Sequence, residues 1–152
     1  MYDIREIKAD ETRSLRQAIL RPHQTLAECV YPGDDDPQTF HLGAFDGDTL
    51  VTITSVYVER ETRFDVFGTD SQFRLRGMAT LEPYRGRGIG GTLLRECLNR
   101  SWSAGAKLFW CNARTSASGY YDKMGFRAIP ELFEIPEIGP HRVMFIERPS
   151  EP

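Results

Sequence analysis

A glycine-rich stretch flanked by arginines has the most specific chemistry in this sequence. Residues 85–91 read Arg-Gly-Arg-Gly-Ile-Gly-Gly, so four glycines and two arginines fall within seven positions. Glycines leave main-chain N–H groups open to close approach, and a helix that begins there adds the positive end of its dipole. Arg85 and Arg87 would add positive charge. The stretch therefore predicts a loop that cradles a pyrophosphate.

Other interpretations of this loop fit the sequence less well. Gly86, Gly88 and Gly91 match the G-x-G-x-x-G of dinucleotide-binding folds, but that fingerprint follows its strand directly and needs an acidic residue about 20 positions later. Here residues 82–85 intervene, and the next apolar run ends at residues 111–114 without a carboxylate. A Walker A loop would need G-K-[ST], which is absent. A helix cap without a ligand needs fewer glycines.

The whole chain has the composition of one globular domain. It contains 152 residues, 40% of them hydrophobic and 27% charged, which suffices for one core. The net charge of -3 hides an asymmetry: residues 1–72 hold 14 acids and 7 bases (-7), and residues 73–152 hold 8 acids and 12 bases (+4). Two interpretations stay open: a chance division of surface charge, or a polyanion bound by the second half and a cationic group bound by the first.

Several classes of protein are disfavoured. Three scattered cysteines without a C-x-x-C pair indicate neither a disulfide framework nor a zinc site. The N-terminus lacks a signal-peptide pattern, and no apolar run approaches the roughly 18 residues of a membrane span. The negative net charge argues against a nucleic-acid partner. We expect a cytoplasmic protein that binds no membrane.

The hydrophobic periodicity predicts an α/β (α+β) fold. Strands are predicted over residues 2–8, 40–46, 49–60, 73–81, 107–113, 126–135 and 141–147, with a hairpin around Gly47. Helices are predicted after Asp10, which could cap the first, from Gly88 to Gly105, and over 116–124. The loop at 85–91 thus lies between a strand and a helix.

These residues resemble the GNAT superfamily of acyl-CoA-dependent N-acyltransferases. Residues 85–90 look like the family's [QR]-x-x-G-x-[GA] signature, and residues 117–126, Ala-Ser-Gly-Tyr-Tyr-Asp-Lys-Met-Gly-Phe, are similar to its A-x-x-x-Y-x-x-x-G-F motif. Residues 131–144 and an early Leu-Arg-Gln-Ala-Ile-Leu-Arg-Pro-His segment resemble an ElaA-like branch. The resemblance implies one domain over 1–152, with a mixed sheet of about seven strands splayed at the cofactor site and flanked by helices.

The resemblance also implies a cofactor site. In the family, the strand before the loop binds the pantetheine arm through its main chain, which implicates Met78, Ala79 and Thr80. The pyrophosphate would then meet a run of loop residues: Arg85, Gly86, Arg87, Gly88, Ile89, Gly90 and Gly91. Side-chain packing of the strand in the core is compatible with this role, since only the backbone is used.

Tyr121 occupies the family's tyrosine position, where the phenol assists the departing thiolate. A phenol with a pKa near 10 can donate toward a thiolate whose conjugate acid has a pKa near 8.5. Its neighbour Tyr120 is better explained by packing. The family often has an asparagine where Arg114 stands here. Asn112 lies two residues earlier, and whether either residue takes that place stays open.

The general base is not given by the family pattern, because the run 107–113 contains no acid. Glu59 and His141 are the candidates, each acting directly or through water. Both have ordinary alternatives: Glu59 could be a solvated residue among neighbouring charges, and His141 could simply bind a backbone carbonyl. The acidic loop at residues 33–36 is expected near the same acceptor site.

The resulting hypothesis is direct attack of a neutral primary amine on acetyl-CoA. Strand N–H groups near Ala79 would stabilise the oxyanion, and Tyr121 would assist thiolate loss. We expect no metal and no covalent intermediate on Cys111. The acceptor is a small molecule or a protein amine, and a homodimer is an open alternative to a monomer. An inactive CoA-binding sensor and an acyltransferase using another acyl-CoA are alternatives that the sequence leaves open.

Overall fold

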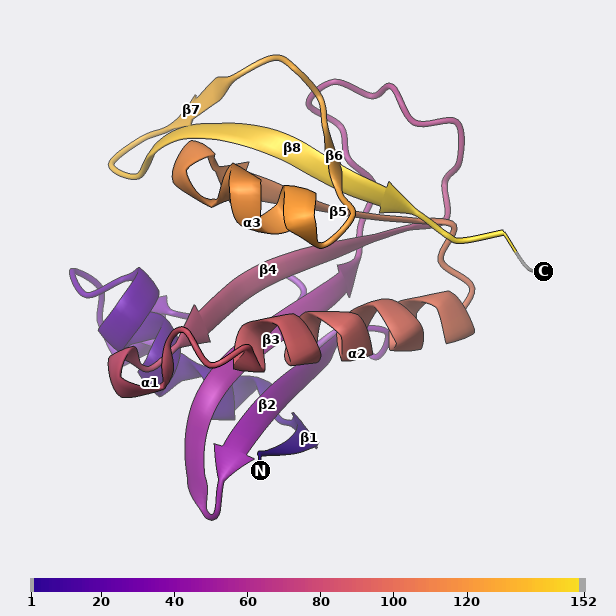
Figure 1. The fold of residues 1–152 in the computed structure, drawn as a ribbon. Coiled ribbons are helices and arrows are strands. Elements are labelled where there is room, and N and C mark those ends of the chain that lie inside the picture. Colours follow the sequence, from indigo (N-terminus) through magenta and orange to yellow (C-terminus); the bar gives the residue numbers. More distant parts are fainter. Residues whose placement is uncertain (1, 151–152) are drawn as a thin grey trace. The chain divides into compact units, whose positions relative to one another are not determined.

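The computed structural model describes residues 2–150, which form two compact units. The first unit contains the chain up to Val58 together with Leu75–Arg100. The second contains Glu59–Arg74 and the chain from Ser101 onward. Figure 1 follows the chain through its strands and helices. The chain therefore crosses from one unit to the other more than once, and each unit is described by itself below.

Within residues 2–150, the regular structure consists of eight strands, three α-helices and several short helical segments of other types. The strands are β1 (Asp3–Ile7), β2 (Phe40–Asp46), β3 (Thr49–Val58), β4 (Gln72–Thr80), β5 (Leu108–Arg114), β6 (Arg127–Ala128), β7 (Phe133–Ile135) and β8 (Gly139–Glu147). The helices are α1 (Arg13–Leu15), α2 (Ile89–Ser103) and α3 (Ser118–Lys123). Short turns at Ala9–Thr12 and Arg16–Leu20 extend α1 into an irregular helical segment.

The strands form one mixed sheet, which confirms the predicted fold class. Their hydrogen-bonded order is β1-β2-β3-β4-β5-β8-β6, and β7 pairs with β8. Strands β1, β2 and β3 are antiparallel, whereas β4 and β5 are parallel. The β4–β5 pairing runs only from Gln72↔Leu108 to Arg74↔Trp110. Such a short pairing agrees with the predicted splaying at the cofactor strand.

In the first unit, two apolar clusters fix the elements around β3. Ile53 packs with Leu15 of α1 and Ala79 of β4. Val51 packs with Ala44 of β2 and with Ile89, the first residue of α2. Burying these side chains stabilises the unit by roughly 1.5–3 kcal/mol for each large one. The end of β4 and the start of α2 are thereby held on a common scaffold.

In the second unit, aromatic residues supply most of the packing. Trp110 of β5 and Val143 of β8 form a buried cluster with Phe133 and Phe145 at its edge. The ring of Phe109 lies 6.2 Å from that of Phe126, beyond the end of α3, in an edge-to-face arrangement. Strand β5 is therefore held by apolar contacts as well as by its hydrogen bonds to β8.

Two sequence-based expectations about local structure are wrong. The strand predicted over 126–135 is two short strands, β6 and β7, because Pro130 interrupts the ladder. Asp10 does not cap the first helical segment. Lys8 holds the cap position, and its N–H donates to Oε1 of Glu11 at 2.9 Å. None of the helices within residues 2–150 has both the length and the apolar character of a membrane span.

Candidate functional site

The glycine loop lies in the first unit, between the end of β4 and the start of α2. Gly86 and Gly88 have φ of +77° and +79°, a conformation that residues with side chains rarely adopt. A Cβ atom at either position would meet nothing within 4 Å. Helix α2 begins at Ile89, directly after the loop, so the N–H groups of its first turn have no acceptor within the helix itself. This geometry is compatible with the predicted pyrophosphate loop, and the binding itself stays a prediction.

The two arginines of the loop are exposed but tethered. Nε of Arg85 donates to the carbonyl oxygen of Thr80 at 3.1 Å. Nη1 of Arg87 donates to the hydroxyl of Tyr2 at 3.0 Å, and its guanidinium lies 5.1 Å from the ring centre of Tyr84. The hydrogen bond to Tyr2 raises the pKa of Arg87. Both charges therefore stay beside the loop.

The strand before the loop uses its side chains for packing. Ala79 is buried in the cluster around Ile53, and Met78 is half-buried. The hydroxyl of Thr52 donates to that of Thr80 at 3.2 Å. Cofactor binding through the main chain of residues 78–80 stays a prediction, and the carbonyl oxygen of Thr80 already accepts from Arg85.

In the second unit, Tyr121 on α3 hydrogen-bonds the thiol of Cys111 on β5. Burial, with the contact to Cys111, raises the pKa of Tyr121 well above 10. Burial raises the pKa of Cys111 to about 12. Both groups therefore stay protonated at neutral pH. A phenol with so high a pKa donates a hydrogen bond to a thiolate rather than losing its proton outright, which sharpens the role predicted from sequence.

Asn112 does not lie beside Tyr121. Side chains alternate along a strand, so Asn112 projects from the face of β5 opposite to that of Cys111. Arg114 shares the face of Asn112 and is exposed. The described contacts assign neither residue to a cofactor, and a role for Asn112 in cofactor binding stays a prediction.

Glu59 is paired with a cation and remains partly exposed. Its Oε2 accepts a hydrogen bond from Nη1 of Arg74 at 2.8 Å, with the two side chains 42% and 16% exposed. Its backbone oxygen accepts from Nε1 of Trp110 at 2.9 Å. This hydrogen bond fixes the position of the carboxylate and occupies one of its two oxygens. This geometry weakens the case for Glu59 as the base.

His141 is buried, with 4% of its surface exposed, and only one of its ring nitrogens has an identified partner. Its Nδ1 lies 2.8 Å from the carbonyl oxygen of Gly139, which can only accept, so Nδ1 carries the hydrogen. In the neutral ring, Nε2 is then unprotonated, and it makes no hydrogen bond within residues 2–150. The ring of Phe133 lies 5.8 Å away and restricts the orientation of the imidazole. The carbonyl contact thus orients the imidazole, and a role for His141 as the base stays a prediction.

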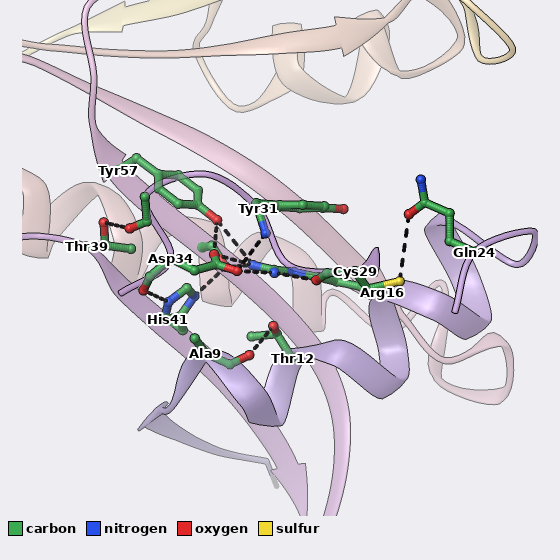
Figure 2. A network of polar contacts seen from close by, with 12 residues as sticks. Ala9, Thr12, Arg16, Gln24, Cys29, Tyr31, Asp34, Thr39, His41 and Tyr57 are labelled. Atoms are coloured by element: carbon green, nitrogen blue, oxygen red, sulfur yellow. Dashed lines mark hydrogen bonds and ion pairs between the residues drawn. The ribbon is translucent and has the colours of Figure 1, made fainter. Parts of the chain in front are cut away.

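A buried polar network in the first unit was not foreseen from the sequence (Figure 2). Arg16 is fully buried, and its Nη1 and Nη2 donate to the two carboxylate oxygens of Asp34 at 2.7 and 3.0 Å. The hydroxyl of Tyr57 donates to Asp34 at 2.6 Å. Asp34 belongs to the acidic loop expected near the acceptor, but this ion pair neutralises it. Asp35 and Asp36 are the exposed acids of that loop.

His41 and Ser55 extend this network. Nε2 of His41 lies 3.0 Å from the carbonyl oxygen of Asp34, so Nε2 carries the hydrogen. Nδ1 then accepts from the hydroxyl of Ser55 at 2.6 Å, and that hydroxyl accepts from Nη2 of Arg16 at 2.9 Å. The network fixes the loop around Asp34 onto β2 and β3. Residues so far apart in sequence offered no spacing signal by which to find it.

Comparisons with known proteins agree with this architecture. Residues 37–128 match the family described as acetyltransferase (GNAT) domain. YitI of Bacillus subtilis (strain 168), an uncharacterised N-acetyltransferase, is 39% identical over 145 residues, 95% of each chain. ElaA of Escherichia coli has a TM-score of 0.76 at 19% identity, covering 97% of this chain and 100% of that one. An aminoglycoside 6'-N-acetyltransferase complexed with coenzyme A has a TM-score of 0.74 at 16% identity, covering 97% and 99%.

Proposed function

Because the chain belongs to the GNAT acetyltransferase family, we propose that it transfers the acetyl group of acetyl-CoA to a primary amine. The geometry of the loop is the observation that supports this proposal most directly. Gly86 and Gly88 have positive φ beside open space, directly before the N-terminus of α2. A pyrophosphate would accept hydrogen bonds from the exposed N–H groups and gain from the helix dipole. Arg85 and Arg87 would add charge from the same loop.

The donor arm would continue along β4. Residues 78–80 would offer main-chain groups, and the side chains of Ala79 and Thr80 are already engaged within the first unit. Bound acetyl-CoA would supply the thioester: the amine nitrogen attacks its carbonyl carbon, a C–N bond forms, and the C–S bond breaks. An N–H near Ala79 would stabilise the negative charge on the carbonyl oxygen.

His141 is our proposed proton acceptor. An amine is mostly protonated at neutral pH, so a proton must leave the nitrogen before or during attack. Nε2 of His141 has the free lone pair for this, directly or through water, because Nδ1 is committed to Gly139. Glu59 is the weaker candidate, since its carboxylate is paired with Arg74.

Tyr121 would assist the departure of the thiolate. Its raised pKa keeps the phenol protonated, so it can donate a hydrogen bond as negative charge develops on sulfur. The thiol of Cys111 is the hydrogen-bond partner of the phenol, so Tyr121 would exchange that partner for the thiolate. Buried as it is, Cys111 is a structural group, and the reaction needs no acyl-cysteine.

Two glycines allow a controlled test of cofactor binding. Asparagine tolerates positive φ better than most residues, so Gly88→Asn adds a side chain to the open space with little backbone strain. Gly47→Asn is the matched control, because Gly47 has φ of +60° and an equally open Cβ position in the β2–β3 turn. Acetyl-CoA should raise the melting temperature of the wild type and of Gly47→Asn, but not of Gly88→Asn.

Catalysis is tested by thiol release from acetyl-CoA with a panel of primary amines. Amine-dependent release supports the proposal. If acetyl-CoA stabilises the protein but no amine yields thiol, the chain is a binding module rather than an enzyme. If acetyl-CoA stabilises all three proteins equally, the loop at residues 85–91 does not bind it.

A further inference from the structure

One face of the second unit carries a row of three side chains from neighbouring strands. Arg114 of β5 is directly opposite His141 of β8, and His141 is directly opposite Phe133 of β7. Residues paired in this way project from the same face of a sheet, with Cβ atoms about 5 Å apart. The ring centres of Phe133 and His141 lie 5.8 Å apart. The imidazole therefore stands between a guanidinium and an aromatic ring.

The imidazole in this row presents a single polar atom to solvent. Only 4% of His141 is exposed. Its Nδ1 is bound to the carbonyl oxygen of Gly139, whereas Nε2 has no hydrogen-bond partner among residues 2–150. Nε2 is also not one of the fully buried polar atoms that lack a partner, so the exposed part of the ring includes this nitrogen. An otherwise enclosed side chain thus has one open hydrogen-bonding position.

Two arginines place positive charge around this nitrogen. Arg114 is exposed and stands beside His141 in the row. The guanidinium carbon of Arg63 lies 3.9 Å from the ring centre of Phe133. Its charge is therefore within about one Debye length of the imidazole, about 10 Å at 0.1 M salt. In the part of the chain that the structure describes, neither guanidinium forms a hydrogen bond or an ion pair.

The acids closest to the row do not neutralise these arginines. The carboxylate of Glu61 accepts hydrogen bonds from two main-chain N–H groups. Asp65 forms an ion pair with Arg60. Glu134 is next to the aromatic residue of the row in β7, so it projects from the opposite face, and Glu137 is exposed in the turn that follows. The row is therefore a cationic surface around an open imidazole nitrogen.

We infer that the acceptor amine carries an anionic group, a carboxylate or a phosphate, that binds the guanidinium of Arg114 while the amine meets Nε2 of His141. This inference rests on the proposed function, in which His141 takes a proton from the amine. The planar donors of arginine match the oxygens of both anions. Because the two side chains start about 5 Å apart, only a few bonds separate the amine from the anion. Arg63 adds a second positive charge.

Arg114 would set the specificity of this chain in particular. It stands where the GNAT family often has an asparagine, which carries no charge. An anionic acceptor also departs from the sequence-based expectation of an acidic acceptor surface at residues 33–36. The structure supports that departure, because Asp34 of this loop is already paired with Arg16.

The test compares primary amines that differ in the anionic group. The pairs are alanine with alaninamide and O-phosphoethanolamine with ethanolamine, each assayed with acetyl-CoA by thiol release. Loss of the negative charge makes the amine less basic, which leaves more free amine and by itself favours the neutral member. The wild type should nevertheless prefer the anionic member of at least one pair by about tenfold or more in kcat/KM. The pair that shows this preference identifies the anion.

Variants then assign the preference to the row. Arg114→Gln should reduce it about tenfold, mainly through a higher KM for the anionic acceptor, and Arg63→Gln severalfold. Lys107→Gln is the matched control, because it also removes one exposed positive charge. Lys107 precedes β5 at the end away from Arg114, about 20 Å along the strand, so its loss should leave the preference unchanged. Melting temperatures confirm that each variant is folded.

The inference and the proposed function fail in different ways. A preference for the neutral members, or a preference that Arg114→Gln leaves unchanged, overturns the inference but leaves acetyl transfer standing. If no pair turns over, alanine and O-phosphoethanolamine are titrated into the CoA-saturated protein by calorimetry. Absence of saturable binding there, or equal binding by Arg114→Gln, overturns the inference as well. Absence of acetyl-CoA binding refutes the proposed function itself.

Discussion

Removal of the carboxylate of Asp34 should destabilise the protein strongly. In Asp34→Ala, Arg16 loses two hydrogen bonds of 2.7 and 3.0 Å while remaining fully buried. Tyr57 and the N–H of Tyr31 lose their acceptor as well. Breaking a buried ion pair from one side costs about 3–5 kcal/mol. At about 2–4 °C per kcal/mol for a chain of this size, the melting temperature should fall by about 6–20 °C.

Urea unfolding followed by circular dichroism measures this loss directly. Asp35→Ala is the control, because Asp35 is exposed and its removal should change the free energy of unfolding by less than about 0.5 kcal/mol. The double variant Arg16→Met/Asp34→Leu should regain most of the loss, since apolar replacements of a buried pair are often neutral or better. A loss below about 1 kcal/mol in Asp34→Ala would refute the claim that this pair holds the loop.

The same pair has a defined pH dependence. Burial opposes ionisation of Asp34, but the hydrogen bonds from Arg16 and Tyr57 prevail and lower its pKa. A carboxyl with a depressed folded-state pKa stabilises the protein above its unfolded pKa, and that stability is lost as the pH falls through the folded value. The difference between the wild type and Asp34→Ala should therefore be constant from pH 7 to about 5 and shrink below about 4.

The remaining predictions concern the reaction. Tyr121→Phe should lower kcat about tenfold or more, while acetyl-CoA still raises the melting temperature as in the wild type, because the lost hydrogen bond forms mainly as the sulfur becomes anionic. Wild-type kcat in Tyr121→Phe would reject this role. The base is tested by kcat/KM for an amine that the wild type acetylates. In His141→Gln this value should fall about 100-fold or more, and in Glu59→Gln it should fall much less. A fall in kcat/KM in Glu59→Gln as large as that in His141→Gln, or larger, would contradict the assignment of His141 as the base.

The sequence by itself determined the local framework of the cofactor loop. A run of glycines between an alternating strand and an amphipathic helix restricts the backbone conformation locally, so the strand–loop–helix order at residues 73–105 was predictable. The hairpin around Gly47 was predictable for the same reason, because its turn and its two strands are adjacent in sequence. The family followed from two short motifs, Arg85–Gly90 and Ala117–Phe126, since each depends on closely spaced residues.

Only the tertiary structure decided which polar side chains are paired and which remain available. The sequence around Asp34 predicts a solvated acid in a loop. In the structure, Asp34 is paired with Arg16, which lies 18 positions earlier in the same unit. From the sequence, Glu59 and His141 were equal candidates for the base. In the structure, Arg74 forms an ion pair with Glu59, and the carbonyl of Gly139 orients His141. Packing between elements separated in sequence set the pairs Arg16–Asp34 and Arg74–Glu59. No spacing within the chain encodes such contacts, because they form only when the strands and loops that carry them are packed together.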